Sequence, residues 1–183
     1  MKMNRSLASV IIVCLTAVAA TAQDKPRVSP TQTVKAQIDG ADVSITYGAP
    51  FTKDPKTGES RKIWGGLVPY GQVWRTGANE ATTLTTTKAL EIGGTTVPAG
   101  SYTLFTLPEE KGASKLIINK QTGQWGTKYD QSQDLARVDL TKKTSDKQVD
   151  QFAMAITTGS KESHNLSMRW ETTEFSVPIK VKS

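Results

Sequence analysis

The chain has 183 residues and a formal net charge of +6 at pH 7, which is enough for one ordinary domain and a short leader. It contains one cysteine, Cys14, and one histidine, His164, so a disulfide framework and a multi-histidine or cysteine-based zinc site are both excluded. Its basic residues are spread along the chain without interleaved aromatic residues. This distribution predicts a solvated surface and no nucleic-acid binding.

The first 22 residues have the pattern of a cleaved secretory signal peptide. Lys2 and Arg5 precede an uncharged stretch, residues 7–22, which ends in the small residues Ala20 and Ala22. This stretch is shorter than the roughly 20 predominantly apolar residues that a transmembrane helix needs. We therefore expect an exported protein of the cell envelope, periplasmic or secreted, whose mature chain has no transmembrane segment and no cysteine.

After the leader, residues 23–33 are polar and proline-containing, and they predict a flexible lead-in to a single domain over residues 34–183. The domain opens with a hairpin. Residues 34–38 and 43–47 each alternate apolar and polar side chains, and an Asp-Gly turn at 39–40 separates them. A period of two on both sides of Asp-Gly is one of the strongest local hairpin signals.

Short strands with turn residues between them continue to the C-terminus. We expect them at residues 81–87, 90–92, 95–97, 101–107, 115–119, 135–140, 149–156, 165–170 and 175–181. Helix is limited to a turn near residues 131–135. Two long polar segments, 50–66 and 123–134, are predicted loops, and loops of this length in a compact domain are often functional. The pattern predicts an all-β fold, an antiparallel β-sandwich of jelly-roll or immunoglobulin-like layout.

Several motifs together resemble a known family. They are Arg-Lys-Ile-Trp-Gly-Gly at 61–66, Trp-Arg-Thr-Gly-Ala-Asn-Glu at 74–80, Pro-Ala-Gly-Ser-Tyr at 98–102, and Gln-Trp-Gly at 124–126 with Tyr129. The chain is similar, from residue 29 to its end, to the secreted bacterial family called Domain of Unknown Function 2911. Residues 52–60 depart from the family pattern and look like an inserted turn. The resemblance implies export and a compact β domain, and it implies no activity.

The segment 63–80, with Arg61 just before it, holds the candidate binding site. Charged, amide and aromatic side chains lie there on a backbone punctuated by glycines, which are the ingredients of a small-ligand site. Arginines would contact an anionic or hydroxyl-rich group, tryptophans would form a stacking wall, and the amide and carboxylate would orient the ligand. The candidate residues are Arg61, Trp64, Tyr70, Trp74, Arg75, Asn79 and Glu80. They predict an envelope domain that binds a small ligand, a glycan or a protein partner without catalysis.

Two other interpretations stay open. One is a metal-independent hydrolase acting on glycans, in which Glu80 and either Asp130 or Asp134 form the carboxyl pair. The other is a purely structural or assembly domain. In it Arg75 and Glu80 form a partly buried ion pair, and the aromatic residues Trp64, Tyr70, Trp74, Trp125 and Trp170 fill the core.

No residue pattern supports an assigned catalytic group, metal site or cofactor. His164 stands at the start of a predicted strand, where a surface histidine is ordinary. Asp130, Asp134 and Asp139 lack the spacing of an EF-hand calcium loop, and the glycines are scattered turn formers rather than a phosphate-binding loop. We therefore lean toward binding rather than catalysis.

Overall fold

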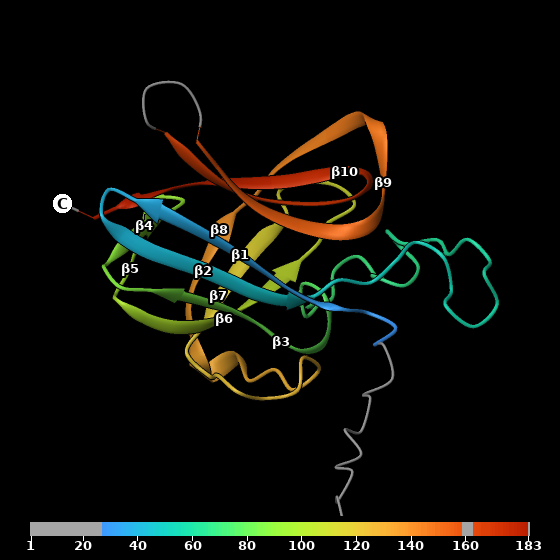
Figure 1. The fold of residues 1–183 in the computed structure, drawn as a ribbon, viewed down its shortest axis with the longest axis horizontal. Coiled ribbons are helices and arrows are strands. Elements are labelled where there is room, and N and C mark those ends of the chain that lie inside the picture. Colours follow the sequence, from blue (N-terminus) through green and yellow to red (C-terminus); the bar gives the residue numbers. More distant parts are fainter. Residues whose placement is uncertain (1–26, 159–162, 183) are drawn as a thin grey trace, which may run out of the picture.

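The computed structural model describes residues 27–158 and 163–182. The predicted signal peptide, residues 1–22, lies outside this range, as does the first part of the lead-in. Two antiparallel sheets pack face to face (Figure 1), which confirms the predicted all-β sandwich. A single turn of 3-10 helix, η1 (Gln131–Gln133), falls where the sequence predicted one. Within the described residues no helix is long and apolar enough to cross a bilayer.

The first sheet has six strands, and neighbouring strands of it are mostly consecutive in the chain. Their spatial order is β1 (Thr31–Ile38), β2 (Ala41–Gly48), β3 (Ala78–Thr86), β6 (Gly100–Leu107), β7 (Lys115–Asn119) and β8 (Asp134–Asp139). The predicted Asp39-Gly40 hairpin joins β1 to β2, and both turn residues have positive φ angles, 45° and 73°. This is the conformation that a two-residue hairpin turn requires.

The second sheet has four strands and receives the chain twice. Its order is β5 (Thr95–Val97), β4 (Leu90–Ile92), β10 (His164–Val181) and β9 (Thr141–Thr158). The β4–β5 hairpin turns on Gly93 and Gly94, with φ angles of 55° and 81°. The chain then returns to the six-stranded sheet through β6 to β8 before it ends in the long β9–β10 hairpin.

Strand β10 is continuous, although the sequence predicted two strands at 165–170 and 175–181. Glu171 has a left-handed φ of 51°, and the pairing with β9 shifts register on both sides of it. This bulge moves the buried positions from even numbers, such as Met168 and Trp170, to odd numbers, such as Phe175 and Val177. Because a bulge reverses the alternation, the sequence pattern is interrupted while the strand continues.

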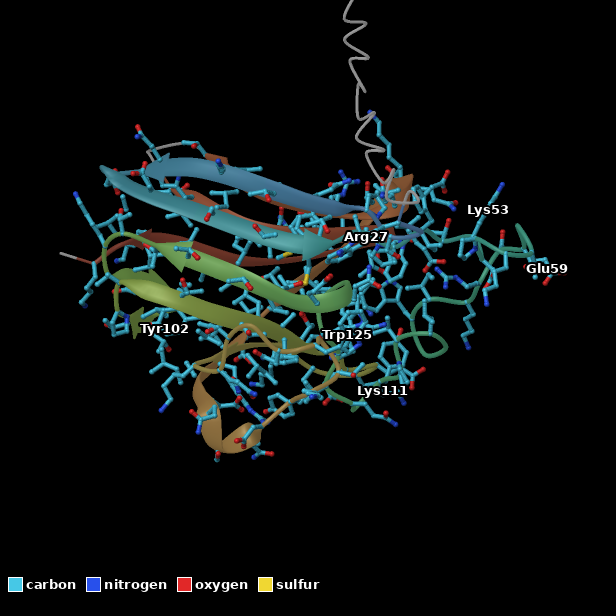
Figure 2. The ribbon with its side chains drawn as sticks, turned by 60° about the horizontal axis from the view of Figure 1, so that its bottom comes forward. Arg27, Lys53, Glu59, Tyr102, Lys111 and Trp125 are labelled. Carbon is cyan, nitrogen blue, oxygen red and sulfur yellow. The ribbon has the colours of Figure 1, made fainter. Side chains whose placement is uncertain are left out.

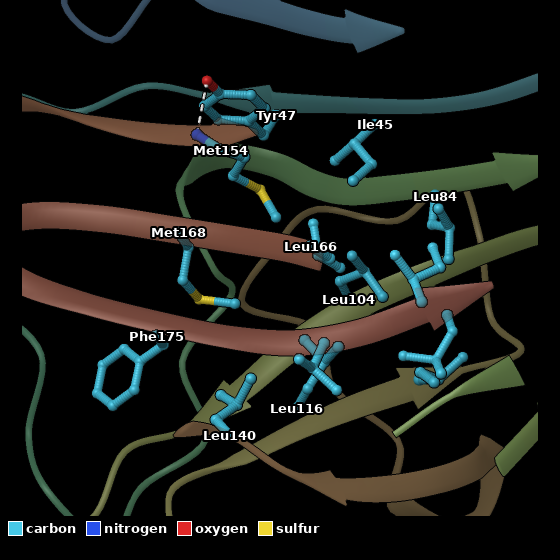
Figure 3. Close-up of a cluster of buried hydrophobic side chains, with 14 of the residues drawn as sticks. Ile45, Tyr47, Leu84, Leu104, Leu116, Leu140, Met154, Leu166, Met168 and Phe175 are labelled. Atoms are coloured by element: carbon cyan, nitrogen blue, oxygen red, sulfur yellow. Dashed lines mark hydrogen bonds between the residues drawn. The ribbon is translucent and has the colours of Figure 1, made fainter. Parts of the chain in front are cut away.

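The core lies between the two sheets (Figure 3). Leu84 and Leu104 of the six-stranded sheet face the same interior as Leu166 and Met168 of β10, and all four are at most 1% exposed. Full burial of such a side chain contributes about 1.5–3 kcal/mol. Tyr47 links the sheets through its phenol oxygen, which donates to Gln32 Oε1 (2.9 Å) and accepts from the Met154 amide (3.0 Å).

One end of the sandwich carries the long segment between β2 and β3, residues 49–77, and faces away from the C-terminus (Figure 1). The inserted turn expected at 52–60 is a small hairpin. Lys53 and Ser60 form a backbone bridge, the Asp54 amide donates to the Glu59 carbonyl (2.7 Å), and the Arg61 amide donates to the Thr52 carbonyl (3.0 Å). Figure 2 shows Lys53 and Glu59 of this hairpin at the same end as Arg27 and Trp125, opposite Tyr102.

Candidate functional site

A cavity of about 400 Å³ opens at the loop-bearing end of the sandwich. Its walls come from the segment 49–77, the start of β3, the loop that follows β7, and the segment just before β1. Three cationic side chains, Lys53, Arg61 and Arg75, line it, and the described residues contribute no aspartate, glutamate or histidine to the lining. The cavity is therefore electropositive, and its size suits a small molecule.

Arg75 is held at the cavity wall by the fold itself. Its Nε donates to the Gly77 carbonyl (3.3 Å), and its aliphatic stem lies over Gly126, where an added Cβ would come within 2.7 Å of Arg75 Cδ. It forms no ion pair with any described residue, and burial lowers the pKa of its guanidinium. The remaining N–H groups of this half-buried cation are free to bind an oxyanion in two-point fashion.

Arg61 stands at the base of the inserted hairpin and also lines the cavity. Its Nη2 donates to the carbonyl of Phe51, which ties the two ends of the hairpin together. Its Nε is buried and has no acceptor. A buried donor without a partner costs free energy, so an acceptor supplied from outside the chain would be favourable here.

The backbone beside Arg75 is strained. Thr76 and Asn79 have left-handed φ angles of 53° and 64°, and Gly77 between them has φ 146°. A β-branched residue in this region costs on the order of 1–3 kcal/mol, and such strain clusters at functional sites. Buried hydrogen bonds hold Thr76 in place, because its hydroxyl pairs with that of Thr106 (2.7 Å) and its carbonyl accepts from Thr82 Oγ1 (2.8 Å).

Asn79 and Glu80 hold the segment that precedes β1 against the cavity. Asn79 Nδ2 donates to the Ser29 carbonyl (3.2 Å), and Glu80 pairs with Arg27 Nη1 through both carboxylate oxygens (2.8 and 2.9 Å). Val28 and Ser29 thereby become part of the cavity wall. The pKa of Glu80 is lowered, first by its own backbone amide and then by Arg27. The predicted Arg75–Glu80 ion pair is wrong, because β3 turns Glu80 toward Arg27.

The tryptophans divide between the core and the cavity. Trp74 stacks on Trp170 (6.0 Å between ring centroids, 18° between planes) and meets Phe152 edge-on (5.1 Å). Trp64 packs edge-on against Phe175 (5.3 Å) and Trp74 (5.9 Å), away from the cavity lining. Trp64 and Trp170 therefore pack in the core as the structural interpretation predicted. Trp170 and half-buried Trp74 also line the cavity. Trp125 contradicts that interpretation, since 48% of it is exposed.

A second arginine cluster adjoins the cavity through Tyr129. The Tyr129 hydroxyl donates to Asp134 Oδ2 (2.6 Å) and accepts from Arg137 Nη2 (2.7 Å), while Arg137 Nε also binds Asp134 Oδ2 (2.9 Å). Asn119 Nδ2 donates to the other oxygen of Asp134 (2.9 Å). Burial, and then the Asp134 carboxylate, raise the pKa of Tyr129 to about 12. This Tyr129–Asp134–Arg137 cluster satisfies its own charges.

The carboxylates proposed for hydrolysis all have other partners, and none lines the cavity. Glu80 binds Arg27, Asp134 belongs to the cluster around Tyr129, and Asp130 caps η1 by accepting from the Ser132 amide (2.9 Å) and hydroxyl (2.7 Å). Among the described residues, no three histidine, cysteine or acidic side chains approach closely enough to share a metal ion.

His164 is buried, 8% exposed, rather than on the surface as the sequence suggested. It occupies the first inward position of β10, in line with the buried residues Leu166 and Met168. Its Nδ1 lies 3.2 Å from the hydroxyl of Thr158 on β9. The histidine therefore helps to close the end of the β9–β10 hairpin.

Comparison with known proteins identifies the family. Residues 29–179 match the family described as "Protein of unknown function (DUF2911)". The chain belongs to this family. No match was found among curated proteins, and none among solved structures. The matched range includes every residue that lines the cavity except Val28.

The structure brings together four of the seven predicted site residues. Arg61, Trp74, Arg75 and Asn79 line the cavity. Three others, Trp64, Tyr70 and Glu80, do not; Tyr70 instead receives the ammonium group of Lys142 over its ring (5.9 Å). The sequence analysis missed the apolar and N-terminal wall, formed by Val28, Ser29, Phe51 and Leu67, together with Lys53 of the inserted turn. Apolar residues within otherwise polar loops, such as Phe51 and Leu67, were the sequence signal that could have predicted this wall.

Proposed function

We propose that this DUF2911 chain is an exported envelope domain that binds a small oxyanion ligand, a carboxylate or a phosphate, in the cavity, without chemical conversion of it. The observation that carries the proposal is the charge of the cavity. Lys53, Arg61 and Arg75 line it, and no described acidic residue balances them there. Export is supported by the signal-peptide pattern of residues 1–22.

Arg75 is the expected anchor. Leaving a half-buried guanidinium without a carboxylate costs desolvation energy that the fold could avoid with a nearby acid. The strained backbone from Thr76 to Asn79 and the close packing against Gly126 keep the side chain at the cavity wall. Such a preorganised donor group loses little further entropy when an oxyanion binds.

Binding fits the cavity better than hydrolysis does. Glycoside hydrolysis needs two carboxyl groups facing one substrate. Glu80, Asp130 and Asp134 lie outside the lining and are each engaged elsewhere. The wall supplies hydrogen-bond donors, aromatic rings and apolar side chains, which can hold and orient a ligand but provide no carboxyl pair.

The test is a thermal-shift screen of the mature protein against organic carboxylates, phosphates, acidic sugars and neutral sugars, followed by calorimetry of any hit. A specific ligand raises the melting temperature by mass action. We expect anions alone to raise it, and Arg75→Met to abolish the shift. The matched control is Lys88→Met, which also removes one cation, but an exposed one that lies just beyond the far end of β3.

Two results would overturn the proposal. One is a screen in which no anion stabilises the parent protein. The other is an Arg75→Met variant that binds the hit as tightly as the parent and Lys88→Met proteins do. A turnover of the hit, detected as a changed product by mass spectrometry, would replace binding with catalysis.

A further inference from the structure

Exposed apolar side chains gather at the mouth of the cavity. The large hydrophobic residues that stand exposed in the described chain are Val28 (58%), Phe51 (41%), Leu67 (47%) and Trp125 (48%). Three of them line the cavity, and Trp125 directly precedes Gly126, which also lines it. An apolar cluster of this kind beside a concave site marks a surface that is covered in the functional state.

The four residues come from three separate segments, so their meeting is a product of the fold. Val28 is held there by the contacts of Asn79 and Glu80 with the neighbouring residues 27 and 29. Phe51 and Leu67 flank the inserted hairpin, and Trp125 is fixed by its backbone bridge to Glu80 of β3. The contacts that build the cavity thus also place its apolar rim.

We infer that the ligand of the cavity is amphipathic: one carboxylate or phosphate head bound at Arg75, joined to an apolar body that lies against Phe51, Leu67 and Trp74. The inference rests on the proposed function and adds the chemical class of the ligand. Cations on one part of the wall and exposed apolar side chains on another match a molecule that carries both features. A volume of about 400 Å³ holds a small molecule of this type.

The strongly polar character of sugars fits this rim less well. A glycan would place hydroxyl groups against Phe51 and Leu67, where the described wall supplies few acceptors and no carboxylate. An inorganic anion would satisfy Arg75 and leave the rim exposed. Only a ligand with both parts removes the apolar surface from water and pairs the guanidinium, and both effects contribute to affinity.

The experiment compares matched probes by calorimetry on the mature protein. The first set is 3-phenylpropionate, propionate and the neutral 3-phenylpropan-1-ol; the second is phenyl phosphate and inorganic phosphate. We expect the phenyl group to tighten binding of either head by at least about tenfold, as burial of a ring implies. We also expect loss of the charge in the alcohol to weaken binding by about tenfold or more. The stronger set identifies the head group.

Two variants assign the parts of the ligand to their walls. Leu67→Ser, at an exposed position, should weaken 3-phenylpropionate about three- to tenfold and leave propionate unchanged, because only the apolar body contacts that side chain. Arg75→Met should weaken both acids alike. Trp125→Ser is the control for the rim, since Trp125 is exposed but does not line the cavity, and it should change the affinity less than Leu67→Ser.

The outcomes separate this inference from the proposed function. If propionate and 3-phenylpropionate bind equally well, or Leu67→Ser leaves their ratio unchanged, the amphipathic ligand is refuted and the small-oxyanion site stands. If the alcohol binds as tightly as the better of the two phenyl-bearing anions, or neither the carboxylates nor the phosphates bind, both ideas fail.

Discussion

Two arginines lie near the cavity, Arg137 and Arg75, and they differ in whether a carboxylate neutralises them. Arg137 lies between Asp134 and Tyr129, with partners at 2.9 and 2.7 Å, and these contacts raise the pKa of its guanidinium. Arg75 has a single weak contact, to the Gly77 carbonyl at 3.3 Å, and burial lowers its pKa. Tyr129 belongs to both places, because it completes the first cluster and lines the cavity.

The difference gives a physical criterion for separating the structural Arg137 from Arg75, which we propose binds a ligand. Arginine, aromatic and amide side chains surround both positions, so residue type does not separate them. What separates them is the carboxylate: Asp134 supplies it for Arg137, and no described residue supplies it for Arg75. A cluster that satisfies its own charges stabilises the fold, whereas one that lacks its counter-charge is ready to bind it from solution.

The largest effect is expected where the self-satisfied cluster loses its carboxylate. Asp134, whose side chain is only 13% exposed, accepts from three side chains, so Asp134→Ala leaves several donors unpaired. We expect the free energy of unfolding to fall by about 2–3 kcal/mol, measured by urea denaturation. Asp139→Ala on the same strand is the control. The Asp139 side chain is 67% exposed, so its pair with Lys115 is worth at most about 0.5 kcal/mol. Equal losses in the two variants would contradict the comparison.

A smaller effect should follow from ionising Tyr129, because solvent still reaches part of this residue. Its pKa is about 12 in the folded protein, above the ordinary value of 10.0, so the folded state favours the neutral phenol. The stabilisation is therefore complete below pH 10 and is lost as the pH rises toward 12. Ultraviolet titration of the tyrosines should show a late component that Tyr129→Phe removes. If the late component were unchanged in Tyr129→Phe, it would belong to another tyrosine, for example Tyr47, whose pKa is also raised.

Replacing the unpaired Arg75 should stabilise the protein rather than destabilise it. Arg75→Met keeps the aliphatic stem over Gly126 and removes a charge that has no counter-charge in the chain. We expect the free energy of unfolding to rise by about 0.5–1 kcal/mol, while ligand binding is lost. Arg137→Met provides the contrast and should lower it by about 1–2 kcal/mol, since Asp134 and Tyr129 lose a partner. If both variants were destabilised alike, Arg75 would be a structural residue.

The smallest effect on stability is expected at the Arg27–Glu80 pair. Both side chains are more than half exposed, at 57% and 53%, so Glu80→Gln should leave the free energy of unfolding nearly unchanged. Its consequence should be local: deuterium exchange in the segment before β1 becomes faster, because one of the contacts that hold Val28 and Ser29 is lost. Glu91→Gln, which breaks contacts to Lys180 and Lys182 instead, should leave that exchange unchanged.

The sequence predicted the fold well because its signals are local. Alternation around Asp39-Gly40 and the Gly93-Gly94 turn set two hairpins correctly, and η1 forms where a short turn was expected. The errors also have local causes. The bulge at Glu171 divides one strand into two apparent ones, and most of β9 from Thr141 to Asp150 is exposed, so it lacks a buried face to reveal it.

The site was predicted only in part, because its partners are distant in the chain. The motif at 74–80 contains Trp74, Arg75 and Asn79, which line the cavity, but the partner of Glu80 is Arg27, 53 residues away. Nothing in the sequence ties that lead-in residue to β3. Similarly, the sequence suggests that Trp125 is a core residue. In the structure its backbone pairs with Glu80, and 48% of the residue is exposed.

The hairpin at residues 52–61 can change in length without disturbing the two sheets. The backbone hydrogen bond between Thr52 and Arg61 and the contact of Arg61 with the Phe51 carbonyl close the base of the hairpin. A change in the number of residues between them therefore does not move the strands of the two sheets. Lengthening a loop closed in this way costs little free energy. Yet Lys53, Pro55 and Arg61 all face the cavity. Insertions and deletions here can therefore remodel one wall of the cavity while the sandwich that carries it stays the same.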